Sequence, residues 1–166
     1  NVTIPYKQAV MPYLDGISPG AESIGAVNTV VNRNGRLFGY NSDLSGMLAL
    51  AHRIGVDAKG KKVLILGTGG TSKTAFHAAK ALGAGKIYKV SRSGRDGALT
   101  YAEAAEKHRD AQIIFNTTPA GMFPRFDTQA IPLEGFDALE ALLDVVYNPL
   151  RTNLVLEAQA MGASAD

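Results

Sequence analysis

The sequence contains no cysteine, which excludes disulfide bonds, thiolate zinc sites and cysteine nucleophiles. It also lacks long apolar runs: VLIL and ALLDVVY are far shorter than the roughly 20 residues of a membrane-spanning helix. No basic-then-apolar leader precedes a small-residue cleavage site. We therefore expect a cytoplasmic protein with no membrane partner, and 166 residues suit one domain or one domain with part of a second.

Both ends of the chain lack features of a complete domain. It opens at Asn1, without methionine and already inside an apolar-polar pattern. It ends at GASAD, directly after a helical segment and without a closing strand. We therefore expect a piece of a longer protein, truncated at both ends.

Acidic residues are missing from the stretch between Lys59 and Arg95, which carries nine lysines and arginines although the formal net charge of the chain is only +2. Such a basic block attracts an anion. Nucleic acid is not the expected partner, because the block contains buried-looking strands and no interleaved aromatic and basic residues. A phosphorylated small molecule fits the pattern better.

Two regions follow one another along the chain. Residues 1–43 mix short β-like pieces with Pro/Gly turns such as LDGISPG, and NRNGRLFGY is typical of a hairpin turn. Residues 44–58 carry apolar side chains at helical spacing, with Ser42 or Asp43 as the expected N-cap and Gly55 as the stop. This helix is expected to link the first region to residues 59–166.

The second region alternates strands and helices, which predicts an α/β fold with a parallel sheet. Each apolar run of strand length is followed by a turn, and three Ala-rich or amphipathic runs have helical length. The expected strands are 61–67, 86–93, 112–119 and 141–149, and the expected helices are 71–85, 100–111 and 152–163.

A glycine-rich turn, GTGGTS, joins the first of these strands to a helix. Glycines at such a turn let backbone N–H groups approach a pyrophosphate at the positive end of the helix. The last position departs from the standard fingerprint, because serine stands where glycine or alanine is usual. The residues expected to bind a dinucleotide here are Gly67, Thr68, Gly69, Gly70 and Thr71.

The end of the second strand carries a cation where an NAD-binding unit has an acid. A carboxylate there would accept from the ribose 2′-hydroxyl and repel a 2′-phosphate. Instead Arg92, flanked by Ser91 and Ser93, offers a guanidinium and two hydroxyls that suit a phosphate. The sequence therefore indicates NADP, unless Arg92 and Arg95 are simply solvated loop charges.

Three polar residues of the first region are candidates for chemistry. NVTIP is expected to be a strand ended by Pro5, so Lys7 lies just past its end, although such a lysine is also a common surface charge. Asn28 stands between β-branched residues, where its amide needs partners in a site, a turn or the core. Asp43 begins the linking helix, as a catalytic group or as an N-cap.

Together these pieces resemble the shikimate dehydrogenase family. The resemblance is carried by NVTIPYK, IGAVNT, GYNSD, GTGGTSKTA, VSRS, NTTPAGM and DVVYNPLRT, in that order and over nearly the whole chain. It implies a Rossmann-like cofactor domain, here residues 59–166, and an α/β substrate domain, of which residues 1–43 would be a part.

The resemblance also implies the activity, which is the reversible NADPH-dependent reduction of 3-dehydroshikimate to shikimate in chorismate and aromatic amino-acid biosynthesis. It makes Lys7 and Asp43 the catalytic pair. The implied substrate contacts are Asn1, Thr3, Asn28 and Tyr147. The protein would act on a small molecule, without nucleic acid, as a monomer or a homodimer.

For the cofactor, the resemblance assigns the glycine turn and the clamp Ser91, Arg92 and Ser93. It adds the implied contacts near the nicotinamide half, which are Asn116, Thr117, Thr118 and Val145. The alternative for the NTTP residues is that their side chains only close the turn after the third strand. The clamp's first residue is usually asparagine. The family's carboxylate-gripping serine motif and late-helix glutamine would lie before Asn1 and after Asp166.

Three alternatives stay open. A quinate/shikimate dehydrogenase using NAD is disfavoured by Arg92, and a catalytically inactive NADP-binding module is disfavoured by the pair Lys7 and Asp43. A relative of methylene-folate dehydrogenase fits NTTPAGM and GAVNT less well. No metal is expected, because the three histidines show no metal-ligand spacing.

Overall fold

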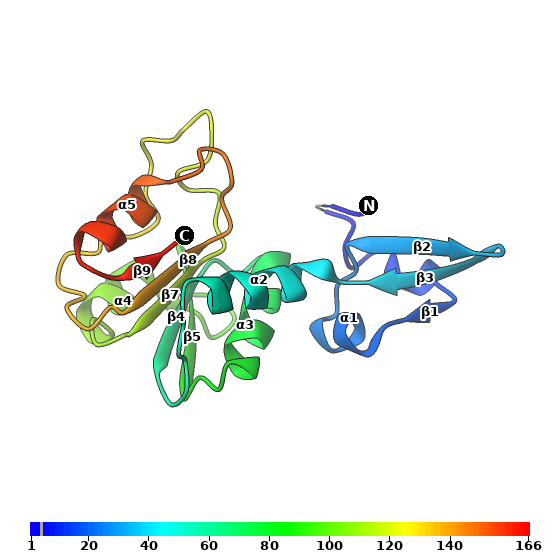
Figure 1. The fold of residues 1–166 in the computed structure, drawn as a ribbon, viewed down its shortest axis with the longest axis horizontal. Coiled ribbons are helices and arrows are strands. Elements are labelled where there is room, and N and C mark those ends of the chain that lie inside the picture. The colour runs from blue at the N-terminus through cyan, green and yellow to red at the C-terminus, as the bar shows by residue number, and fades with distance from the viewer. Residues whose placement is uncertain (4) are drawn as a thin grey trace.

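The computed structural model describes residues 1–3 and 5–166 and consists of two units joined by one helix (Figure 1). The smaller unit contains the N-terminus and a three-stranded sheet, and the larger unit contains a six-stranded sheet between two layers of helices. None of the described helices is long and apolar enough to cross a membrane.

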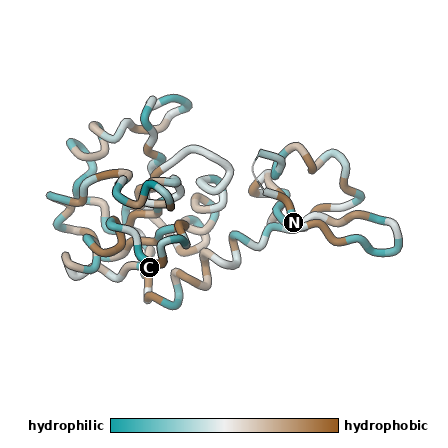
Figure 2. The backbone as a smooth tube through the Cα atoms, turned by 90° about the horizontal axis from the view of Figure 1, so that it is seen from above, coloured by the Kyte–Doolittle hydropathy of each residue, from teal (hydrophilic) through white to brown (hydrophobic). Residues whose placement is uncertain are grey.

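The small unit is built around a hairpin of β2 (Thr29–Arg33) and β3 (Arg36–Tyr40). Its turn, Asn34–Gly35, has positive φ at both residues, as the sequence predicts for this dipeptide. The tip of the hairpin is hydrophilic (Figure 2). The hairpin prediction is confirmed.

The stretch LDGISPG is more than the predicted turn. It contains β1 (Gly16–Ile17), which pairs in parallel with β3, and the start of α1 (Pro19–Ile24). Ser18 caps α1 through its hydroxyl, which accepts a hydrogen bond from the Ala21 N–H. Elements this short have no readable periodicity, so the sequence shows only their Pro/Gly content.

The opening segment is not the strand that the sequence predicts. Residues 1–3 have no strand pairing, and Ile4 lies outside the described residues. Two backbone hydrogen bonds hold the segment instead, from Val2 N–H to the Asn28 carbonyl (2.7 Å) and from Val27 N–H to the Lys7 carbonyl (2.8 Å). A short 3₁₀ helix, η1 (Met11–Tyr13), follows.

The linking helix α2 (Ser42–Arg53) begins with a different cap from the one expected. The N-cap is Asn41, whose side-chain oxygen accepts from the N–H groups of Asp43 (3.0 Å) and Leu44 (3.4 Å). Ser42 and Asp43 are instead the first two helical residues, so the Asp43 side chain is free for other partners. Gly55, with φ of 73°, follows the end of the helix as predicted.

The larger sheet is parallel throughout and has the strand order β6-β5-β4-β7-β8-β9. This is the order of a Rossmann sheet, so the predicted α/β Rossmann-like fold is confirmed. The strands are β4 (Lys62–Leu66), β5 (Lys86–Ser91), β6 (Leu99–Thr100), β7 (Ile113–Asn116), β8 (Ala141–Asp144) and β9 (Ser164–Ala165). The helices are α3 (Gly70–Ala81), α4 (Tyr101–Lys107) and α5 (Asn153–Ala160).

A closing strand is present, contrary to the expectation from the sequence. Ser164 and Ala165 form β9, which pairs in parallel with β8. The strand β6, of equal length, pairs with β5 at the opposite edge and was not expected either. Two-residue strands show no alternation, and only their neighbours in the sheet define them.

The core lies on both faces of the sheet. β4 is buried along Val63–Leu66, because alternate side chains meet different helices. Leu64 and Leu66 join the cluster under α4 and α5, whereas Val63 and Ile65 join the cluster under α2 and α3. Figure 1 shows these two helix pairs on opposite sides of the sheet.

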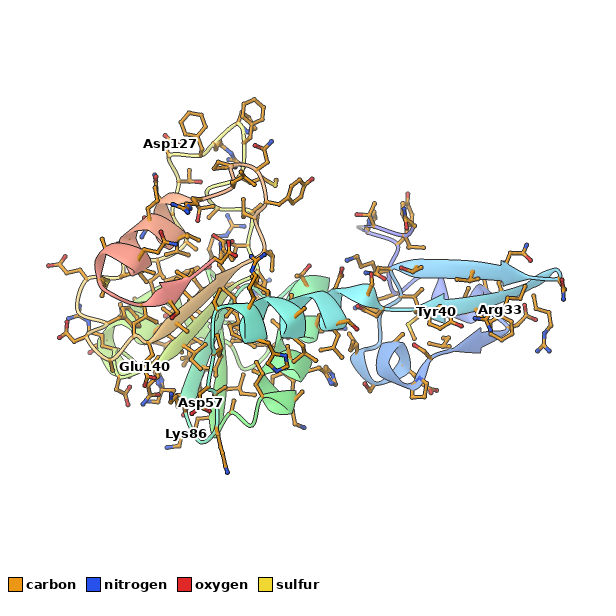
Figure 3. All side chains as sticks on the ribbon, in the orientation of Figure 1. Arg33, Tyr40, Asp57, Lys86, Asp127 and Glu140 are labelled. Atoms are coloured by element: carbon orange, nitrogen blue, oxygen red, sulfur yellow. The ribbon has the colours of Figure 1, made fainter. Side chains whose placement is uncertain are left out.

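Part of the basic block faces away from the glycine turn. Lys61 pairs with Glu140 at 2.7 Å and Lys62 with Asp110 at 2.5 Å, both at the amino edge of the sheet. Lys86 begins β5 at the same edge of the sheet, and Figure 3 shows Lys86 and Glu140 at one end of the unit. Acids from outside the block therefore neutralise part of it, so the anion attraction predicted for the whole block is confined to its other members.

Candidate active site

The order in which strands are added to the sheet reverses at β4. The strands β5 and β6 lie on one side of it, and β7, β8 and β9 lie on the other. In open parallel sheets, ligands bind in the crevice outside the carboxyl ends of the strands at such a point. The glycine turn follows β4, and the predicted clamp begins at Ser91, the last residue of β5. The turn NTTP begins at Asn116, the last residue of β7, and the loop with Val145 and Tyr147 follows β8. The topology therefore brings all the predicted cofactor residues to one edge.

Gly67 is required by its own geometry. Its φ is +109°, and a Cβ there would lie 2.7 Å from Oγ1 of Thr117. The Gly67 N–H donates to the Val90 carbonyl at 2.7 Å, and the Thr117 hydroxyl donates to the Leu66 carbonyl at 2.6 Å. The first glycine thus lets the turns after β4 and β7 pack directly together.

The N-terminus of α3 is open. Its N-cap is Gly69, and its first turn has no acidic residue. Apart from the adjacent residues and the backbone of α3 itself, no described atom lies within 4 Å of a Cβ built on Gly69 or Gly70. Thr68 is exposed and Thr71 is half-buried beside this opening. The free N–H groups and the positive end of the helix dipole make it suitable for a phosphate.

The serine that departs from the fingerprint is turned inward. Ser72 is fully buried, and its hydroxyl donates to the Gly69 carbonyl at 2.7 Å. It therefore occupies the interior position of a small residue without entering the crevice. The departure does not close the opening at the start of α3.

The predicted clamp after β5 is divided. Ser91 is 9% exposed, and its hydroxyl accepts from the Gly94 N–H at 3.1 Å. Arg92 and Ser93 are exposed. Burial raises the pKa of Tyr101, and the positive charge of Arg92 opposes that shift. Arg92 and Ser93 are available to an anion, while Ser91 shapes the turn.

The side chains of the NTTP turn close that turn. Asn116 is fully buried and donates to Asp144 Oδ1 at 2.9 Å. Its oxygen accepts from the N–H and the hydroxyl of Thr118, at 3.1 and 2.7 Å. The Thr117 hydroxyl is bonded to Leu66, as described above. These hydrogen bonds are the ones expected if the side chains close the turn after β7, which is the alternative that the sequence left open.

One buried acid was not singled out from the sequence. Asp144 ends β8, is 6% exposed, and accepts hydrogen bonds from Asn116, Val146 and Thr152. The available signal was a charged residue inside the apolar run ALLDVVY. After it, Val145 is 36% exposed and Tyr147 is 81% exposed.

Lys7 and Asp43 meet at the junction of the small unit and α2. Lys7 Nζ lies 2.6 Å from Asp43 Oδ2, and their side chains are 17% and 31% exposed. Residues 36 positions apart in sequence thus form a partly buried ion pair. Partial burial reduces solvent screening of this pair, and one side of it stays accessible.

Asn28 holds the other oxygen of this carboxylate. Its side-chain N–H donates to Asp43 Oδ1 at 2.7 Å. Its side-chain oxygen accepts from the Ser42 N–H at 3.0 Å and from the Thr29 hydroxyl at 2.9 Å. Asn28 therefore orients Asp43, a function that the sequence did not assign to it.

The other predicted substrate contacts are exposed. Asn1 and Thr3 flank Val2, which is hydrogen-bonded to the Asn28 carbonyl, so both lie near the Lys7–Asp43–Asn28 cluster. An ammonium held by a carboxylate can donate a proton to an oxygen that is gaining negative charge. The cluster therefore suits proton transfer to or from a carbonyl or alcohol oxygen.

Comparisons with known proteins agree with this arrangement. Residues 1–30 match the family described as "Shikimate dehydrogenase substrate binding domain". The chain is 38% identical over 174 residues to a shikimate dehydrogenase (NADP(+)) of Geobacillus sp. strain WCH70. This alignment covers 96% of this chain and 63% of that protein.

Two solved structures are similar over the same length. The shikimate 5-dehydrogenase of Thermus thermophilus, in complex with NADP(H) and shikimate, is 33% identical with a TM-score of 0.85 over 100% of this chain and 65% of that one. The quinate dehydrogenase of Corynebacterium glutamicum, in complex with NAD, is 30% identical with a TM-score of 0.87 over 99% and 64%. The chain spans less than two thirds of the length of these relatives.

Proposed function

The chain belongs to the shikimate dehydrogenase family, and from this premise we propose that the protein catalyses the reversible NADPH-dependent reduction of 3-dehydroshikimate to shikimate. The observation that carries the proposal is the contact of 2.6 Å between Lys7 and Asp43, held in place by Asn28. A protein that only binds a cofactor has no need of this pair.

In the proposed reaction, Lys7 acts on the oxygen of the ketone. NADPH, when bound, supplies a hydride to the ketone carbon, and negative charge grows on the oxygen. The Lys7 ammonium stabilises that charge and donates the proton that completes the alcohol. Asp43 keeps the ammonium in place and has lone pairs left to accept from a ring hydroxyl.

The cofactor edge supports NADP over NAD. The open start of α3 suits the pyrophosphate, and Arg92 with Ser93 suits a 2′-phosphate. The end of β5 has no carboxylate to accept from a free 2′-hydroxyl or to repel the phosphate. We propose that residues 59–166 bind NADP and that residues 1–43 belong to the substrate domain, with Asn1, Thr3 and Tyr147 as substrate contacts.

Oxidation of quinate with NAD is the second candidate. The similarity to the quinate dehydrogenase in complex with NAD favours it. Arg92 argues against NAD, because a guanidinium at this place gains nothing from an uncharged 2′-hydroxyl.

Initial rates with shikimate or quinate, each with NADP⁺ or NAD⁺, test the proposal on the purified protein. Shikimate with NADP⁺ is expected to react fastest. Lys7→Ala is expected to lower kcat by about 100-fold or more, the usual range for a lost general acid, whereas the exposed Lys59→Ala should not. Unchanged turnover in Lys7→Ala, or a preference for quinate and NAD⁺, would contradict the proposal.

A further inference from the structure

Asp144 is a buried carboxyl group satisfied by hydrogen bonds alone. Its oxygens accept from Asn116 Nδ2 (2.9 Å), Val146 N–H (3.0 Å) and the Thr152 hydroxyl (2.7 Å). Among the ion pairs of the described residues, none includes it. Burial raises its pKa, and the three donors oppose that shift. A carboxyl group in this position needs all three donors, because a buried charge without partners is costly.

The three donors belong to three different elements. Asn116 ends β7, Val146 lies in the loop after β8, and Thr152 is the N-cap of α5. The loop 145–151 therefore starts and ends on the same carboxylate. Thr152 also accepts from the Val155 N–H at 3.2 Å, so the contact fixes the start of α5 as well.

The loop held in this way carries exposed side chains to the crevice edge. Tyr147 is 81% exposed and makes no side-chain hydrogen bond with the described residues. Its place depends on the backbone of the loop, which is anchored at Val146 and Thr152. A second anchor, from Phe123 N–H to the Asn148 carbonyl (3.0 Å), ties the loop to the segment after β7.

We propose that Asp144 is a positioning residue for substrate binding, whose carboxylate fixes the loop 145–151 so that Tyr147 is presented to the acid substrate. The inference rests on the proposed function, since it concerns the same site. A carboxylate suits this task because it accepts on both oxygens. An asparagine has one accepting oxygen, and its NH₂ group would face at least one of the three donors.

Steady-state kinetics of Asp144→Asn test the inference, with the exposed Asp127→Asn as the matched control; Figure 3 shows Asp127 on another loop. Asp144→Asn is expected to raise KM for shikimate about tenfold or more. Tyr147→Phe is expected to raise KM for shikimate too. The double variant of Asp144→Asn and Tyr147→Phe should have a KM no higher than that of either single variant, because both changes act through the Tyr147 hydroxyl. Only Asp144→Asn should speed amide hydrogen exchange of the loop 145–151.

The possible results separate this inference from the proposed function. An unchanged KM in Asp144→Asn, or a double variant whose effects multiply, overturns the positioning role while turnover by the unaltered protein still supports the function. Absence of shikimate turnover in the unaltered protein overturns both. Should Asp144→Asn not fold, Thr152→Val and Thr152→Ser replace it. Thr152→Val removes the hydroxyl donor and should raise KM for shikimate. Thr152→Ser keeps a hydroxyl donor and should leave this KM unchanged. Equal KM values of these two variants would overturn the inference.

Discussion

The side-chain N–H of Asn28 lies 2.7 Å from Asp43 Oδ1, on the oxygen that Lys7 does not contact. The carboxylate is thus held from both sides, by a cation from the turn after the opening segment and by an amide at the start of β2. Both partners lie in the small unit, whereas Asp43 belongs to the first turn of the helix that joins the units. A change in the angle of α2 would therefore act directly on the pair.

Asn28→Ala tests whether Asn28 orients Asp43 or binds substrate. Without the amide, Asp43 loses one of its two restraints, so kcat is expected to fall about tenfold, equal to about 1.4 kcal/mol, with a smaller change in KM for shikimate. Asn32→Ala, on the hairpin, is the control and should leave both parameters unchanged. A raised KM with unchanged kcat would show instead that Asn28 is a direct substrate contact.

Gly67→Ala is expected to reduce both stability and cofactor binding. The positive φ and the approach of 2.7 Å to Thr117 predict a loss of about 1–3 kcal/mol in the free energy of unfolding. Gly69→Ala is the matched comparison, since Gly69 has φ of −73° and open space around it. That change should weaken NADPH binding with little effect on stability. Urea unfolding and fluorescence titration measure the two quantities, and equal stability of the two variants would contradict this account of the turn.

Glu103 predicts a specific dependence of stability on pH. Hydrogen bonds from the backbone N–H and the hydroxyl of Thr100 lower its pKa below the ordinary 4.5. Because the folded-state pKa is the lower one, the stabilisation is complete above the unfolded-state value and is lost as pH falls through the folded-state value. Glu103→Gln keeps the capping box. Below about pH 4.5, the free energy of unfolding of this variant should fall less with decreasing pH than that of the unaltered protein.

The control for this pH effect is Glu106→Gln, an exposed glutamate on the same helix. It should leave the pH dependence of the free energy of unfolding as it is in the unaltered protein. Denaturant unfolding at a series of acid pH values measures the effect. If the free energy of unfolding of Glu103→Gln falls with pH as steeply as that of the unaltered protein, the capping box contributes no stabilisation that depends on charge.

The sequence predicts those elements that are long enough to show a hydrophobic pattern or that need a strict local backbone geometry. Four consecutive apolar residues in β4 indicate a strand covered on both faces, and Asn34–Gly35 indicates a hairpin turn. The two-residue strands β6 and β9 give no such pattern, because only pairing with β5 and β8 defines them. The position of Asn41 as N-cap is hidden for a related reason, since Asn, Ser and Asp all suit that role.

The candidate site is predicted where residue type carries the information. Lys7, Asp43 and Arg92 could be chosen from motifs, and the first two do meet. Which side chains turn inward depends on tertiary contacts. For this reason the sequence offers Ser91 and Asn116 to the cofactor, whereas the fold uses both inside turns. Asp144 was missed because its partners come from β7 and α5, which the local sequence does not reveal.

The preference for NADPH over NADH tests the central claim, that Arg92 and the glycine turn bind the two ends of one phosphorylated nucleotide. Fluorescence titrations should give a Kd for NADPH at least tenfold lower, a difference of about 1.4 kcal/mol. Arg92→Ala should abolish the difference. Arg33→Ala, which removes an exposed arginine from the hairpin, should preserve it. Equal affinities of the unaltered protein for the two nucleotides would contradict the account.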